Sequence, residues 1–150
     1  IQPVRGNVLT RLEKLDSGEY GALILAEAGL KRLGLSDRIA YRFSPEELVP
    51  AAGQGILAIQ TRAGEYADLL VRLNSPDGAL CAKTERQLAS LLGGDCSAPV
   101  GCHAQLHGTD MTLYGFSGIG GVPRYGSVQG NRNDADLLVQ QLASKLTITE

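Results

Sequence analysis

The chain has 150 residues, of which 43% are hydrophobic and 20% charged, and a formal net charge of −2 at pH 7. This composition is typical of a globular protein and argues against binding to nucleic acid or to an anionic membrane surface. No apolar run approaches the roughly 18 residues of a membrane-spanning helix. The sequence begins at Ile1 and its only methionine is Met111, so we expect a piece of a longer protein.

The first third of the chain alternates between helix and strand signals. Asn7 is a candidate N-cap for a helix that ends at 16–18 (DSG). Residues 22–26 (ALILA) are continuously apolar, which predicts a strand buried on both faces, and a short helix over 30–35 follows. Residues 39–43 alternate and predict another strand. This order of elements is typical of an α/β domain.

The middle of the chain carries signals for a crossing segment, a strand and two helices. Residues 44–54 carry two prolines and lead into AAGQG, which predicts a crossing segment. The apolar run 56–59 predicts a second buried strand, and 65–73 a short helix. Ser75 and Pro76 then begin a longer helix, because proline suits the first turn. Its inner face is expected to carry Leu80, Cys81, Leu88, Leu91 and Leu92.

From residue 100 onward the pattern becomes antiparallel. Residues 100–106 and 111–116 alternate around a turn, which predicts a hairpin, and 125–129 predict a third strand. Asn133 is a candidate cap for a last helix, whose apolar residues are Ala135, Val139, Leu142 and Leu146. We therefore expect a small α+β domain, with a three-stranded antiparallel sheet and helices, after a partial α/β domain.

Three cysteines, Cys81, Cys96 and Cys102, without a targeting segment predict free thiols in a cytoplasmic protein. Cys96 lies in LGGDCSAPVG (92–101), a loop rich in glycine and proline where a packing cysteine is unexpected. It follows a helix C-terminus and adjoins Asp95, and both features disfavour the thiolate that a cysteine hydrolase needs. The remaining interpretations are an accessible thiol that is alkylated once, or an ordinary loop cysteine.

Cys96, Cys102, His103 and His107 also lie close enough in sequence to suggest zinc. In a strand, however, Cys102 shares the apolar face and His103 the polar face, so the two point apart. We therefore expect no metal site, with Cys102 and Cys81 in the core.

Ten arginines stand against four lysines. Arg5 and Arg11 flank the start of the first helix, and Arg32 lies in the helix after ALILA. Helix N-termini and arginines together bind carboxylates and phosphates. The alternative is that each arginine is a solvated surface charge.

Five blocks resemble the porphobilinogen deaminase (hydroxymethylbilane synthase) family, in the order of that family. They are RGNVLTRL (5–12), LDSGEY (15–20), ILAEAGLKRLGL (24–35), PAAGQG (50–55) and GGDCSAPVG (93–101). The loop of the family often lacks the residue that corresponds to Asp95, and the segment after about 107 resembles the family only in its strand and helix pattern.

The resemblance implies a transferase of tetrapyrrole (porphyrin and haem) biosynthesis, in which Cys96 holds a dipyrromethane cofactor through a thioether. On this primer the enzyme adds four porphobilinogens, each with loss of ammonia, and releases hydroxymethylbilane. Arg5, Arg11 and Arg32 match residues that bind the carboxylates of cofactor or substrate, and Asn7 and Gln54 are weaker candidates. The partners implied are porphobilinogen and the growing polypyrrole.

The catalytic aspartate of the family follows a lysine in a K-D-x-P motif, and no aspartate here follows a lysine. We therefore expect no catalytic residue in this segment, no activity from it alone, and a free thiol at Cys96 unless the cofactor was attached before any cleavage. The alternatives left open are a non-catalytic polycarboxylate-binding module and a cysteine-dependent hydrolase.

The family has three domains and is monomeric. The resemblance implies that 1–45 complete a second, periplasmic-binding-protein-like α/β domain, that 46–65 cross back and supply a strand to the first, and that 66–150 form the third, cofactor-anchoring domain. Without its sheet partners, the strand over 56–59 is expected to make the piece self-associate.

Overall fold

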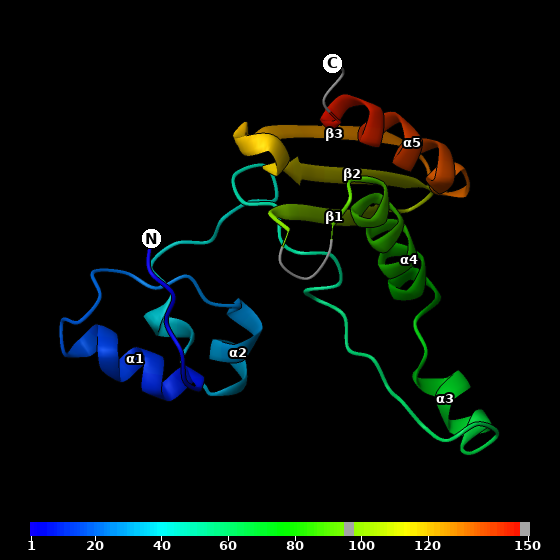
Figure 1. The fold of residues 1–150 in the computed structure, drawn as a ribbon. Helices are drawn as coiled ribbons and strands as arrows, with labels where there is room; N and C mark the ends of the chain where they lie inside the picture. The colour runs from blue at the N-terminus through cyan, green and yellow to red at the C-terminus, as the bar shows by residue number, and fades with distance from the viewer. Residues whose placement is uncertain (95–97, 148–150) are drawn as a thin grey trace. The chain divides into compact units, whose positions relative to one another are not determined.

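A computed structural model describes residues 1–94 and 98–147 of the chain (Figure 1). The chain separates into two compact units, Ile1–Arg42 (unit 1) and Phe43–Glu150 (unit 2). Cys96 and Asp95 lie outside the described residues, so the predictions made for them concern sequence only.

Unit 2 is built on one antiparallel sheet with the strand order β1-β2-β3. The strands are β1 (Val100–His107), β2 (Asp110–Ser117) and β3 (Arg124–Asn131). Ala104 lies opposite Leu113, which in turn lies opposite Val128. These pairings confirm the predicted hairpin and third strand. The alternation of polar and apolar side chains leaves one face of the sheet apolar, and this face is the one that is buried.

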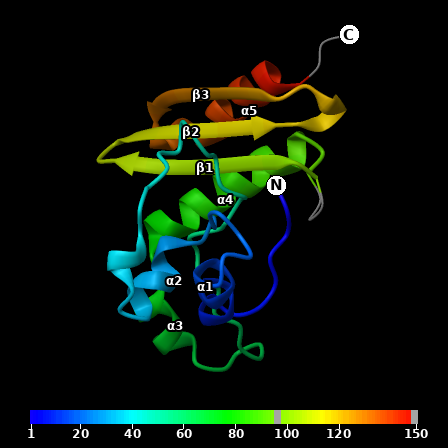
Figure 2. The same ribbon diagram turned by 90° about the vertical axis from the view of Figure 1, so that its left-hand side faces the viewer.

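Two helices, α4 (Pro76–Leu91) and α5 (Ala135–Leu146), cover the apolar face of the sheet (Figure 2). The fully buried apolar side chains between these layers are Leu88, Cys102, Met111, Leu113, Val139, Leu142 and Leu146. The predicted cap of α5 is wrong by one residue. Asp134 is the N-cap, because a 3-10 turn over Arg132–Asp134 precedes the helix and Asn131 caps that turn by accepting from the Asn133 N–H.

A pair of glycines allows α5 to approach the sheet closely. Gly115 of β2 lies opposite Gly126 of β3. A Cβ on Gly115 would lie 2.5 Å from Leu146 Cδ1, and one on Gly126 would lie 3.1 Å from Leu142 Cδ1. Side chains at these positions would therefore push the helix away from the strands.

Residues 45–53 wrap around the free edge of β1. Val49 lies over Gly101 on the face away from the helices, and a Cβ on Gly101 would meet Val49 O at 2.6 Å. At the edge itself, the Cys102 N–H donates to Pro50 O over 2.8 Å. Ala52 then packs against the core on the helix side. The crossing segment predicted for this region is thus anchored to the sheet.

Unit 1 consists of α1 (Val8–Asp16), α2 (Glu27–Arg32) and a 3-10 turn, Ser36–Arg38. The predicted cap is confirmed, since Asn7 Oδ1 accepts the Thr10 N–H over 2.9 Å. Its buried hydrophobic side chains are Leu12 and Leu30.

The strands predicted over 22–26, 39–43 and 56–59 are not formed. Leu57 is 78% exposed and Ile24 64%. The only sheet among the described residues is the antiparallel one, so these apolar segments have no strand to pair with. The α/β part of the expected fold, including its periplasmic-binding-protein-like character, is therefore not seen here. The short helix predicted nearby is present as α3 (Ala67–Leu73).

Within the described part of the chain, none of the helices combines the length and the apolar character needed to span a bilayer.

We expect Gly115→Ala to lower the free energy of unfolding of unit 2 by about 1–3 kcal/mol, because the added methyl group overpacks a closed core. Chemical denaturation followed by circular dichroism measures this change. Gly55→Ala is the matched control, since nothing lies within 4 Å of a Cβ at Gly55. Equal effects of both substitutions would show that the approach of α5 is not tight.

Candidate functional site

The segment that carries Cys96 begins at a well-defined helix end. Gly93, with φ of 71°, donates its N–H to Ser90 O, and the Gly94 N–H donates to Ala89 O over 2.8 Å. These two bonds form a Schellman motif, which satisfies carbonyls that the end of α4 would leave free. A Cβ on Gly94 would lie 2.9 Å from Ala89 O. The two glycines are therefore required to end the helix before the cysteine.

The segment is also fixed where it enters the sheet. Pro99 O accepts the Gly118 N–H over 2.8 Å, and the Val100 N–H donates to Ala98 O over the same distance. A Cβ on Gly118 would lie 3.3 Å from Pro99 side-chain atoms. Residues 95–97 thus connect a capped helix to an anchored strand.

Glu85 lies in the middle of α4 and is the buried carboxylate of unit 2 among the described residues, with a side chain 5% exposed. Its Oε1 accepts the Ala104 N–H over 2.9 Å and lies 3.3 Å from His103 Nδ1. Its Oε2 accepts the Gly53 N–H over 2.7 Å. One side chain therefore joins the helix, the first strand and the segment that leads to Gln54.

The surroundings of Glu85 keep it ionised. Burial by itself would raise its pKa, but the hydrogen bonds from His103, Ala104 and Gly53 outweigh burial and hold the pKa below its ordinary value. A carboxylate with a lowered pKa stabilises the fold above its unfolded-state pKa, and this contribution is lost as pH falls through the folded-state pKa.

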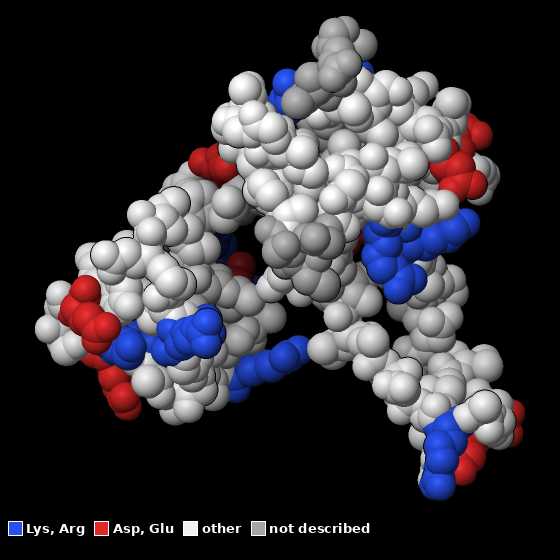
Figure 3. Space-filling view, in the orientation of Figure 1, with Lys and Arg blue, Asp and Glu red and all other residues white. Residues whose placement is uncertain are grey.

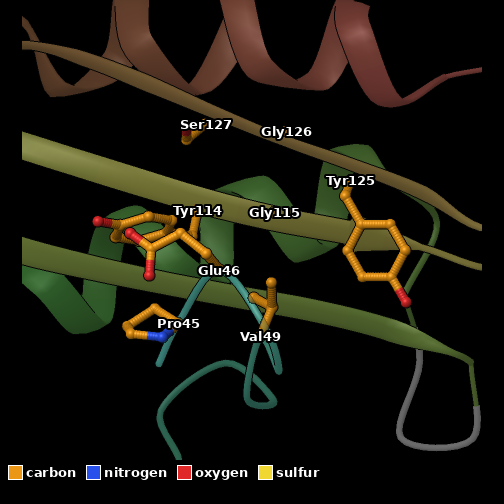
Figure 4. A pocket seen from close by; sticks show the side chains of 8 residues that line it. All are labelled: Pro45, Glu46, Val49, Tyr114, Gly115, Tyr125, Gly126 and Ser127. Carbon is orange, nitrogen blue, oxygen red and sulfur yellow. The ribbon is translucent and has the colours of Figure 1, made fainter. Parts of the chain in front are cut away.

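An open pocket lies on the face of the sheet away from the helices (Figure 4). Tyr114 and Tyr125 flank it, with backbone of Gly115 and Gly126 between them, and Glu46 reaches over Tyr114. The hydrogen bond with Glu46 raises the pKa of Tyr114. None of the described residues that line the pocket is one predicted for the site.

The two described cysteines are poor nucleophiles. Cys102 is fully buried, as predicted. Burial is the larger cause, and the charge of Glu85 the smaller, that raises the pKa of its thiol to about 12. Cys81 is only partly buried, and burial together with the charges of Glu85 and Asp77 raises its pKa too. Since the thiolate is the reactive form, both thiols are protonated at neutral pH.

Cys102 and His103 point to opposite faces of β1, as predicted. In the part of the chain that the structure describes, no three His, Cys, Asp or Glu side chains are grouped closely enough to hold a metal ion.

Some arginines of unit 1 form ion pairs with carboxylates, and one donates to a backbone carbonyl. Arg38 pairs with Asp16 over 2.5 Å, and Arg42 pairs with Glu27 over 2.9 Å. Arg11 donates from Nε to Gly6 O over 2.8 Å, just before α1. On the face of unit 1 drawn in Figure 3, basic and acidic side chains lie next to one another.

The predicted arginines, Arg5, Arg11 and Arg32, form none of the ion pairs recorded for the described residues, and Arg5 and Arg32 are exposed. Arg5 and Arg11 flank the N-terminus of α1, as expected. Arg32 lies in the last turn of α2, not in its first, since α2 begins three residues earlier than predicted.

The weaker candidates differ from each other. The side chain of Asn7 is occupied as the cap of α1. Gln54 is exposed and follows directly after the Gly53 N–H that Glu85 holds.

Glu85 was not predicted from the sequence. One signal was available, because a glutamate four residues after Cys81 and three before Leu88 lies on the apolar stripe of the helix. A charged residue at such a position is rarely buried without partners.

The two halves of the chain match two models of one family. Residues 1–68 match "Porphobilinogen deaminase, dipyromethane cofactor binding domain", and residues 79–147 match "Porphobilinogen deaminase, C-terminal domain".

Curated relatives named porphobilinogen deaminase agree with this result. The chain is 47% identical to that of Chromobacterium violaceum over 150 residues, 45% to that of Thiobacillus denitrificans over 150, and 43% to that of Ruminiclostridium josui over 146. The alignments cover 97%, 97% and 96% of this chain, and 48%, 49% and 50% of the relatives. The chain therefore spans about half the length of the curated relatives it matches.

We expect Cys102 to resist alkylation by iodoacetamide in the folded chain at pH 8. With a pKa of about 12, only about one molecule in ten thousand carries the thiolate, and the sulfur is buried. Peptide mass spectrometry measures the modification, and the same reaction in denaturant should modify all three cysteines. Rapid modification of Cys102 in the native chain would contradict its burial.

Proposed function

The chain belongs to the porphobilinogen deaminase family, and from this premise we propose that it forms the cofactor-carrying half of a transferase of tetrapyrrole biosynthesis. In this proposal the whole enzyme joins four porphobilinogens into hydroxymethylbilane and releases one ammonia for each. The observation that carries the proposal is the match of both family models, in order, to residues 1–68 and 79–147.

Cys96 is proposed as the attachment point of a dipyrromethane, through a thioether. The support comes from the described residues that precede and follow 95–97 in the chain and from the other thiols. The Schellman motif at Gly93 and Gly94 and the bond at Pro99 O fix the two ends of its segment. Cys102 is excluded by burial and Cys81 is held protonated. A thioether resists hydrolysis and thiol exchange, so it suits a primer that stays attached.

Arg5, Arg11 and Arg32 are proposed to bind the acetate and propionate groups of cofactor and substrate. The donors present fit such a ligand, because Arg5 and Arg32 are exposed and Arg11 uses only Nε within the fold. Guanidinium groups bind carboxylates through two parallel hydrogen bonds. When bound, the dipyrromethane supplies the pyrrole end to which substrate units are added.

The domain assignment remains part of the proposal. Residues 1–45 complete a second domain, 46–65 cross to the first, and 66–150 form the third. The exposed apolar segments 22–26 and 56–59 support it, because continuous apolar runs are typical of strands covered on both faces. In the whole protein these segments pair with strands from the half that this chain lacks. The chain by itself is expected to associate with copies of itself and, having no aspartate after a lysine, to be inactive.

We expect the intact mass of the whole protein that contains this chain to include a dipyrromethane, and Cys96→Ser to remove it completely. Mass spectrometry under denaturing conditions gives the result, and Cys81→Ser is the control that should keep the added mass. A retained adduct in Cys96→Ser would disprove the attachment site. A wild-type protein that binds polycarboxylates but never carries an adduct would instead be the non-catalytic module.

Arg11→Leu and Arg32→Leu, made in the whole protein, should each lower kcat/KM for porphobilinogen about 10- to 100-fold. Each loses a charge-assisted contact of about 1.5–3 kcal/mol. The matched control is Arg38→Leu, since Arg38 is paired with Asp16 at the surface and should cost at most about 1 kcal/mol of stability. Normal turnover with reduced thermal stability in the first two variants would make those arginines structural.

A further inference from the structure

The proposed function leaves the buried Glu85 without a role. The free edge of β1 presents two backbone N–H groups toward residues 45–53. The Cys102 N–H is satisfied by Pro50 O, as a neighbouring strand would satisfy it. The Ala104 N–H has no such carbonyl and donates to Glu85 Oε1. The carboxylate therefore stands where the next backbone acceptor of an added strand would be.

The same carboxylate also holds the wrapping segment. Its second oxygen accepts the Gly53 N–H, over the shortest of these contacts at 2.7 Å. Val49, Pro50 and Ala52 approach the sheet through backbone or apolar contacts only. Glu85 is thus the side chain that ties the end of the segment to both helix and strand.

We propose that Glu85 is a positioning residue, whose carboxylate fastens residues 49–53 around the edge of β1 and thereby sets where Gln54 lies relative to the helix that leads to Cys96. That Glu85 holds residues 49–53 follows from its hydrogen bonds with Gly53 and Ala104. The expected effect on turnover also rests on the proposed function.

Glutamine cannot replace this carboxylate. Two N–H groups from different segments each need an acceptor, and Glu85 offers one oxygen to each. An amide has a single oxygen, and its NH₂ group would face the other N–H. In Glu85→Gln one of the two backbone donors is therefore left without an acceptor.

The titratable groups around the carboxylate are few. His103 of β1 lies 3.3 Å from the carboxylate. The charge of Glu85 contributes to the raised pKa of the thiols of Cys102, on β1, and Cys81, on the same helix as Glu85. Residues 49–53 bring no titratable side chain. An amide that donates to a carboxylate changes its chemical shift when that carboxylate is protonated, so the Gly53 and Ala104 amides report on Glu85 directly.

The test is hydrogen exchange and a pH titration of the full 150-residue chain by NMR. In the wild type, the Gly53 and Ala104 amide shifts should follow one common titration, below the ordinary range of a glutamate. In Glu85→Gln this titration should disappear, and exchange at one or both amides should become about tenfold faster. Amides of β2 and α5 should keep their exchange rates. Glu65→Gln, a change to a partly exposed glutamate paired with Arg62, should alter none of this.

A second variant loosens the segment without touching Glu85. Gly101→Ala places a methyl group against Val49 O, and should speed exchange at Cys102 and Gly53 while the strand pairing of β1 with β2 persists. Independent titrations at Gly53 and Ala104, or unchanged exchange at both in Glu85→Gln, would overturn the proposal. So would a uniform loss of protection in both variants, which would indicate a general effect on stability.

In the whole protein, we expect Glu85→Gln to lower kcat by a larger factor than it lowers the fraction of molecules that carry the added mass at Cys96. If exchange responds as expected but turnover does not, Glu85 fastens the segment and the link to Gln54 is wrong. If the wild type itself shows no turnover, the proposed function fails while the exchange result stands.

Discussion

The free edge of β1 imposes the requirement on which the organisation of unit 2 depends. An edge strand that packs against a helix must find acceptors for its outward N–H groups, because buried donors without partners are costly. Here Pro50 O and Glu85 provide them. The chain before α4 is thereby joined to the sheet, and the segment from 45 to 53 becomes part of the same compact body as the sheet and its two helices.

The need of each strand for a hydrogen-bonding partner explains which parts of the fold could be predicted from the sequence. The hairpin and the third strand were correct because each strand meets its partner after a turn of a few residues, so local alternation and turn residues carry the information. The strands over 22–26 and 56–59 were not formed. An apolar run records that a segment is suited to burial, but it does not supply the strand that must lie beside it. Pairing in a parallel sheet comes from distant sequence, and the curated relatives are about twice as long as this chain.

The site was predictable to a different degree for each residue. Cys96, Arg5, Arg11 and Arg32 lie in blocks with strong local signals, and the two arginine positions at α1 agree with the structure. Glu85 was missed because its partners come from residues 53, 103 and 104, none of which is close to it in sequence. The glycines before Cys96 were predicted as part of a loop rich in glycine and proline. Their bonds show instead that they end α4, so the composition of a loop did not reveal what its glycines do.

The net charge of this chain does not describe how its charges are distributed. A chain at −2 is expected to avoid polyanions, yet a polycarboxylate ligand is consistent with it once the arginines are considered one by one. Arg38, Arg42, Arg62 and Arg132 each have a carboxylate partner within the fold, so their charges are largely compensated. Six arginines have no ion pair recorded among the described residues; Arg5, Arg11 and Arg32 lie in the family blocks, and Arg72, Arg86 and Arg124 do not. A ligand experiences the local field of nearby charges more than the sum over the chain, because exposed charges beyond about 10 Å are screened. The local charge that an anion meets on this chain therefore depends on which arginines have carboxylate partners, and not on the net charge alone.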